Sequence, residues 1–172
     1  FRTLFVGSVN LLKGVPYLLQ AWEALGWEND ESAELQLWGD ITSEIEPVLD
    51  QYESKNLSTP GWVDPKPYYR EAAILAFPSL TEGFAKVILE AMSTGTPVIV
   101  SENSGAPDII EDGREGFIVP TRDSDAIAEK LQYFRDNPSE IERMGRNARD
   151  TAEQYTWDRF VDEVIAFLDD PV

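Results

Sequence analysis

Residues 73–100, AILAFPSLTEGFAKVILEAMSTGTPVIV, contain two short apolar runs separated by one amphipathic stretch. The runs Ala73–Phe77 and Thr96–Val100 have the length and the aliphatic content of buried strands. The stretch between them, Gly83–Ser93, carries apolar residues every three or four positions, as one face of a helix does: Phe84, Val87, Ile88, Ala91 and Met92. A strand, a helix and a second strand in this order are typical of a βαβ unit with parallel strands.

The same alternation extends to both sides of this unit. We predict four more strands, at Thr3–Val6, Glu34–Trp38, Gly61–Val63 and Gly116–Val119. The predicted helices are Val15–Leu25, Ile41–Ser54, Tyr68–Glu71, Ser124–Arg135, Ser139–Gln154 and Trp157–Leu168, with Ser124 and Ser139 as N-caps and Pro138 as a break. No internal repeat or linker interrupts the pattern. The sequence therefore predicts one α/β domain, Rossmann-like and three-layered, with a six-stranded, mostly parallel sheet.

The composition is that of a globular chain with a restricted chemistry. The 172 residues include 42% hydrophobic side chains, which excludes a disordered chain. Cysteine and histidine are absent, so disulfides, thiolate metal sites and the commonest general base are excluded. No apolar run approaches the roughly 18 residues of a membrane helix, and no leader is recognisable. We expect a cytoplasmic protein, free or peripheral at the inner face of the membrane.

The chain is strongly acidic, with 14 basic and 32 acidic residues and a formal charge of −18. This charge disfavours nucleic acid as a partner, because phosphate backbones require a cationic surface. Two interpretations remain open. In the first, the dense carboxylates are an adaptation to a salty cytoplasm, where charges are strongly screened. In the second, they belong to an acidic protein of an ordinary cell.

Two loops lie where parallel sheets bind ligands, beyond the carboxyl ends of the strands. They are residues 7–14, GSVNLLKG, and residues 78–86, PSLTEGFAK. In the second loop the backbone N–H groups of Gly83, Phe84 and Ala85 precede a helix, so they can bind a phosphate with the positive end of the helix dipole behind them. The carboxylate of Glu90 can accept two hydrogen bonds from a ribose diol, and that of Glu82 can hold hydroxyls of a sugar beyond the phosphates.

Each of these residues also has a plainer explanation. Glu82 can simply favour the helix dipole, and Glu90 can be a solvated helix residue. Lys86 fits either an exposed ion pair with Glu90 or a contact to an anionic ligand. Lys13 can be a solvated loop cation, and the side chain of Trp62 can serve packing alone.

Residues 78–92, PSLTEGFAKVILEAM, resemble the E-x7-E signature of retaining glycosyltransferase family 4, the glycogen-synthase-like group 1 transferases. The resemblance covers essentially the whole chain. Its other matches are Phe5–Gly7, Lys13-Gly14, the turn Gly61–Val63, Gly95–Ile99, Gly105, Asp112-Gly113, Gly116 and Tyr155–Trp157.

The resemblance implies a role for each matching residue. Glu82 and Lys13 correspond to the catalytic positions, with Glu82 against the donor hexose and Lys13 on the diphosphate. The implied donor-binding set comprises Gly7, Ser8, Trp62, Val63, Gly83, Phe84, Ala85, Lys86 and Glu90, with the turn at Trp62 and Val63 against the nucleobase. No metal and no cofactor are implied, since the nucleoside diphosphate sugar is the substrate.

This sequence departs from the family's pattern at two positions of the first loop. Relatives often carry an arginine where this chain has Ser8 or Leu12. Charge-assisted contacts contribute about 1.5–3 kcal/mol each. The departure predicts weaker diphosphate binding, unless Lys86 supplies the missing charge.

The resemblance also implies what surrounds this domain. The expected architecture is GT-B, with residues 1–172 as its carboxyl-terminal, donor-binding half and an amino-terminal acceptor domain absent from this chain. The whole enzyme would transfer a hexose with retention of anomeric configuration. The alternatives are a non-catalytic nucleotide-sugar-binding or scaffolding module and a dinucleotide-dependent oxidoreductase. The absence of a G-x-G-x-x-G motif argues against the second of these. The nucleobase, sugar, acceptor, pathway and oligomeric state are left open.

Overall fold

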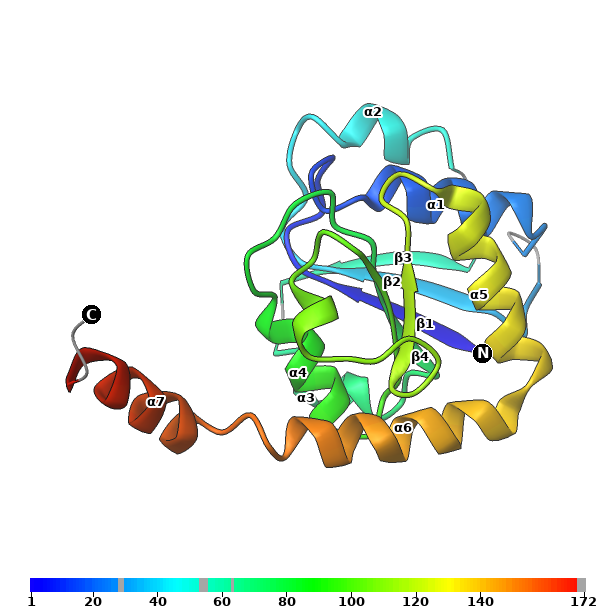
Figure 1. The fold of residues 1–172 in the computed structure, drawn as a ribbon. Coiled ribbons are helices and arrows are strands. Elements are labelled where there is room, and N and C mark those ends of the chain that lie inside the picture. The colour runs from blue at the N-terminus through cyan, green and yellow to red at the C-terminus, as the bar shows by residue number, and fades with distance from the viewer. Residues whose placement is uncertain (28–29, 53–55, 63, 170–172) are drawn as a thin grey trace.

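A single parallel sheet forms the centre of the molecule (Figure 1). The structure, a computed structural model, describes residues 1–27, 30–52, 56–62 and 64–169. The strands are β1 (Arg2–Val6), β2 (Glu34–Trp38), β3 (Leu57–Gly61), β4 (Ile74–Phe77), β5 (Val98–Ser101) and β6 (Gly116–Val119). Their order is β3-β2-β1-β4-β5-β6, and every neighbouring pair is parallel. The prediction of a six-stranded Rossmann-like sheet is confirmed.

Helices cover both faces of this sheet. They are α1 (Val15–Ala24), α2 (Glu46–Leu49), α3 (Lys66–Tyr69), α4 (Lys86–Ser93), α5 (Ser124–Asp136), α6 (Pro138–Ala152) and α7 (Trp157–Asp169), with a short 3-10 helix at Ala106–Asp108. Helix α1 packs beside α5, and α4 packs beside α6. The chain runs outward from β1 to β2 in one direction and from β4 to β5 in the other, so right-handed crossovers place α1 and α4 on opposite faces.

The core lies along the central strands. All residues of β4 and β5 are buried, as expected for parallel strands covered on both faces. At the carboxyl ends of β1 and β4, the rings of Phe5 and Phe77 stack with centroids 5.8 Å apart. This contact fixes the two adjacent strand ends from which the first and second loops leave.

The third strand lies earlier than predicted. It spans Leu57–Gly61, whereas Trp62 follows it and Val63 lies outside the described residues. The apolar pattern of this strand is weak because β3 is an edge strand paired only with β2, and such a strand tolerates polar residues and Pro60.

Helix α2 is much shorter than the predicted Ile41–Ser54, part of which (53–55) lies outside the described residues. The cause is a competing contact, because Ile41 forms an isolated bridge with Val9 and the N–H of Thr42 donates to the Val9 carbonyl at 3.1 Å. These residues therefore join the first loop instead of starting a helix.

The starts of three other helices and the N-cap of α5 also differ from the prediction. Helix α4 begins at Lys86, so Gly83–Ala85 precede it, and α3 begins two residues earlier than predicted. The N-cap of α5 is Asp123, whose carboxylate accepts the N–H of Ala126 at 2.8 Å, and Ser124 is already helical. Asn137 precedes α6, which starts at Pro138, because proline fits a first helical turn.

Helix α7 extends away from the body of the domain (Figure 1). None of its residues is buried, although one face is apolar and includes Trp157, Phe160, Ile165 and Leu168. Among the described residues, no helix is both long and apolar enough to span a bilayer.

Candidate functional site

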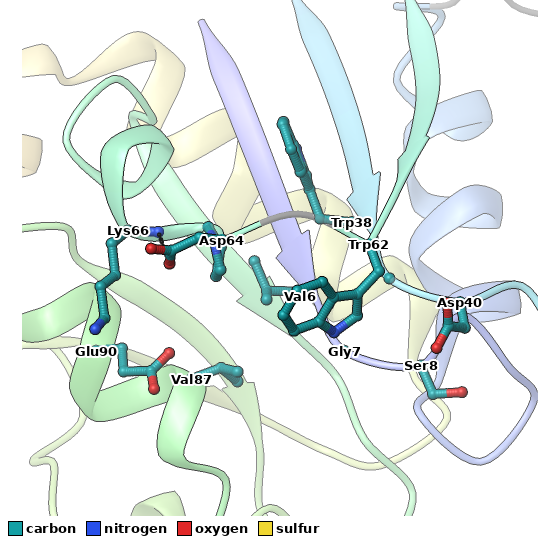
Figure 2. Close-up of a pocket in the computed structure, with 12 residues that line it drawn as sticks. Val6, Gly7, Ser8, Trp38, Asp40, Trp62, Asp64, Lys66, Val87 and Glu90 are labelled. Carbon is teal, nitrogen blue, oxygen red and sulfur yellow. Dashed lines mark hydrogen bonds between the residues drawn. The ribbon is translucent and has the colours of Figure 1, made fainter.

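A cleft of about 670 Å³ opens at the carboxyl ends of the central strands (Figure 2). It lies at the point where the strand order reverses, between β1 and β4, which is where open parallel sheets bind ligands. Its lining comes from the ends of β1 and β2, the turn after β3, and helices α3 and α4: Val6, Gly7, Ser8, Trp38, Gly39, Asp40, Trp62, Asp64, Pro65, Lys66, Val87 and Glu90.

The first loop, residues 7–14, is organised by Asn10. Its side chain accepts the N–H of Lys13 at 2.8 Å and donates to the Ser8 hydroxyl at 3.2 Å. The loop ends at Gly14, which has a φ of 72° and lies against the Pro78 carbonyl. A Cβ at Gly14 would stand 1.9 Å from that oxygen, so this position requires glycine.

The second loop, residues 78–86, lies between the first loop and the loop after β5. The N–H of Leu80 donates to the Leu12 carbonyl at 2.8 Å, and the N–H of Glu82 donates to the Asn103 carbonyl at 2.9 Å. The Gly83 carbonyl packs against Gly105, where a Cβ would approach it to 2.3 Å. These contacts hold the second loop from both sides.

The backbone of Gly83, Phe84 and Ala85 carries free hydrogen-bond donors. Within the described part of the chain, no acceptor contacts the N–H group of any of the three. Ala85 has an extended backbone and is the N-cap of α4, so these donors stand at the positive end of a helix dipole. A group of this kind binds an anion without needing a charged side chain.

Lys13 and Glu82 form an ion pair across the two loops. Both side chains are about three-quarters covered, with exposed fractions of 24% and 23%. The ammonium of Lys13 also lies 5.7 Å from the centre of the Phe77 ring. The two residues with predicted catalytic roles are thus neighbours, and each is the charge partner of the other.

Glu90 faces the cleft and is held by a tyrosine from α3. The hydroxyl of Tyr69 donates to its carboxylate at 3.1 Å. Burial of the Tyr69 ring, together with the charge and hydrogen bond of Glu90, raises the pKa of this hydroxyl well above its ordinary value. Tyr69 therefore remains a donor at any physiological pH. Figure 2 shows the side chain of Lys66 extending from α3 toward Glu90.

Trp62 lies across the cleft between Asp40 and Glu90 (Figure 2). The residue is 73% exposed, so packing does not explain its position. In contrast, Trp38 is buried and packs on Tyr68 with ring centres 4.2 Å apart. An exposed indole beside a cleft offers a flat surface on which an aromatic ligand can stack.

Lys86 does not pair with Glu90 within the described residues. Its ammonium lies 5.6 Å from the centre of the Trp157 ring at the start of α7. Leu12 is exposed, whereas Ser8 lines the cleft.

Four of the residues singled out by the sequence line the cleft, and the others that the structure describes lie in the two loops beside it. Gly7, Ser8, Trp62 and Glu90 line the cleft, while Lys13 and Glu82 are paired in the two adjoining loops. Residues 83–85 adjoin Glu82, and Val63 lies outside the described residues. The described residues contain no group of three or more acidic side chains placed to hold a metal ion; that the site needs no metal stays a prediction.

Sequence reasoning missed three charged residues of the cleft lining, Asp40, Asp64 and Lys66, and the buried Tyr69 that holds Glu90. Asp40 had one usable signal, because it directly follows the β2 strand, where side chains reach the ligand-binding edge. The contact between Tyr69 and Glu90 had none, because it joins residues of two different helices.

Known proteins resemble this chain in sequence and in fold. The family model of glycosyl transferases group 1 matches residues 1–137. A D-inositol 3-phosphate glycosyltransferase of Streptomyces avermitilis is 42% identical over 91 residues, which are 53% of this chain and 20% of that protein. An uncharacterized glycosyltransferase of Methanocaldococcus jannaschii is 30% identical over 167 residues, 94% of this chain and 43% of that protein. The chain thus spans less than half the length of either relative.

The fold also matches a solved structure. The HepE protein of Anabaena, in complex with UDP and glucose, superposes with a TM-score of 0.84 at 20% identity, over 98% of this chain and 47% of that one. The six-stranded parallel sheet with its flanking helices is the architecture of the carboxyl-terminal domain of GT-B glycosyltransferases.

Proposed function

Since the chain belongs to the group 1 glycosyl transferases, we propose that it binds the nucleoside diphosphate sugar of a retaining hexosyltransferase. One observation carries the proposal. The free N–H groups of Gly83–Ala85 stand at the start of α4, with the Lys13–Glu82 pair on one side and Glu90 in the cleft. This arrangement offers an anion site flanked by two groups that bind hydroxyls.

The donor is placed by its chemistry. The diphosphate binds to the free N–H groups and to the ammonium of Lys13, because both stabilise negative charge. The two hydroxyls of the ribose donate hydrogen bonds to the carboxylate of Glu90, which Tyr69 orients. The nucleobase lies near Trp62 and the turn that contains Val63, and the hexose lies beside Glu82. HepE, which shares this fold, binds UDP and glucose.

The mechanism follows from what this half supplies. As the bond between hexose and diphosphate breaks, charge grows on the departing phosphate, and the N–H groups with Lys13 stabilise it. Glu82 orients the ring, and the leaving phosphate helps to deprotonate the acceptor on the same face, which retains the anomeric configuration. Ser8 and Leu12 supply no second positive charge to the diphosphate. We assign this role to Lys86.

The acceptor belongs to a second, amino-terminal domain in this proposal. The chain corresponds to 43% of the Methanocaldococcus jannaschii relative, which leaves room there for a domain of similar size. We therefore expect this chain alone to bind nucleotide without transferring sugar.

A binding panel tests the proposal. UDP, GDP and ADP, each with and without a hexose, are titrated into the chain by calorimetry. We expect one base to bind, and Glu90→Gln to weaken that binding roughly tenfold, since a charge-assisted contact is lost. Glu142→Gln, at an exposed site on α6, is the charge-matched control. The proposal fails if no nucleotide binds, or if the two variants behave alike.

A further inference from the structure

The pairing of Lys13 with Glu82 has a consequence for which nucleotide the cleft retains. Both residues have a separate role toward the donor, yet without donor their charges cancel. The backbone N–H of each is held independently of the pair, that of Lys13 by the Asn10 side chain in the first loop and that of Glu82 by the Asn103 carbonyl in the loop after β5. The pair can therefore open by side-chain rotation while both loops stay in place.

The cleft next to the pair has an acidic lining. The cleft lining contributes three carboxylates, Asp40, Asp64 and Glu90, against the single ammonium of Lys66. A diphosphate entering this cleft gains little from Lys13 while Glu82 neutralises it. Binding must separate the pair, and the carboxylate of Glu82 is then left mostly covered beside a new negative charge. A carboxylate in that position is costly unless other donors reach it.

We propose that the Lys13–Glu82 pair makes the cleft prefer a sugar-bearing nucleotide over the bare nucleoside diphosphate. The inference rests on the proposed function. When a nucleotide sugar binds, Lys13 moves to the diphosphate and the hydroxyls of the hexose donate to Glu82 in its place. When a bare diphosphate binds, nothing replaces Lys13 at Glu82. The pair re-forms in competition with the diphosphate, which promotes release of the product after transfer.

The Glu82→Gln variant tests whether the ion pair, and not a general loss of binding, sets the preference between the two ligands. The glutamine has nearly the same shape and does not neutralise Lys13. Calorimetry is carried out with UDP and UDP-glucose, or with GDP and GDP-mannose or ADP and ADP-glucose if the panel identifies another base. We expect the affinity for the bare diphosphate to rise about fivefold or more, and the affinity for the sugar nucleotide to rise less than about twofold or to fall.

The same substitution in a Lys13→Gln variant distinguishes an effect of the ion pair from simple repulsion between Glu82 and the diphosphate. In Lys13→Gln no pair exists, so adding Glu82→Gln should raise diphosphate affinity much less than it does beside Lys13. Glu142→Gln controls for the lost charge. Equal gains in both backgrounds, equal gains for both ligands, or no gain in Glu82→Gln would each overturn the inference while leaving the proposed function intact. A wild-type chain that binds no nucleotide would overturn both.

Discussion

The site depends on single contacts that a linear motif does not contain. The resemblance of residues 78–92 to the E-x7-E signature implies that Glu82 and Glu90 serve one ligand. The structure places Glu90 in the cleft lining and Glu82 in the loop that precedes the same helix. Neither the pairing of Glu82 with Lys13 nor the bond from Tyr69 to Glu90 could be read from spacing, because each joins residues that only the folded chain brings together.

Tyr69 gives a prediction at this scale. Tyr69→Phe removes the hydroxyl that donates to Glu90 at 3.1 Å and keeps the buried ring. Because one hydrogen bond contributes about 0.5–1.5 kcal/mol, we expect nucleotide affinity to fall roughly two- to tenfold in calorimetry, with the fold retained. The matched control is Tyr133→Phe, whose hydroxyl donates to Glu140 at 3.2 Å from α5, away from the cleft lining. Equal losses in both variants would contradict a positioning role for Tyr69.

At the scale of elements, periodicity predicted the buried strands and long helices and failed where loops compete with them. The runs of β4 and β5 are continuous and buried, so pattern and structure agree. The edge strand β3 and the short helix α2 differ, because β3 has one neighbour and residues before α2 pair with the first loop. Such contacts lie between segments and leave no period in the sequence.

Gly14 lies at the contact between the first and second loops, and a prediction about these two segments follows from it. In Gly14→Ala the new Cβ meets the Pro78 carbonyl at 1.9 Å, so the first and second loops must separate. The control Gly26→Ala has a similar φ of 66° with nothing within 4 Å of the added carbon. A left-handed alanine costs about 1–2 kcal/mol, so Gly26→Ala should lower Tm by about 2–8 °C.

For Gly14→Ala we expect a fall in Tm at least about twice that of Gly26→Ala, together with loss of nucleotide binding. Circular dichroism melts and calorimetry measure the two effects. If nucleotide affinity survives in Gly14→Ala, the contact between the loops does not position the site.

The whole molecule carries a net charge of −18. The effect of this charge on stability depends on how far apart the charges lie and on how strongly salt screens them. Exposed ion pairs such as Arg149–Glu153 and Arg159–Glu163 contribute little and weaken in salt. The excess of carboxylates repels itself over longer distances, and that repulsion falls as the Debye length shrinks from about 10 Å at 0.1 M salt to about 3 Å at 1 M. Repulsion exceeds attraction in this chain, so salt should stabilise it.

We propose on this ground that the acidic composition is an adaptation to high salt. Between about 0.1 and about 1 M potassium chloride we expect Tm at neutral pH to rise by about 5 °C or more. Potassium chloride is preferred to a sulfate, which strengthens apolar burial by itself. Near the pI of about 4.2 the net charge vanishes, so the same salt step should then change Tm little. A salt effect that is equally large at both pH values would identify a cause other than charge, and a Tm independent of salt at neutral pH would favour an acidic protein of an ordinary cell.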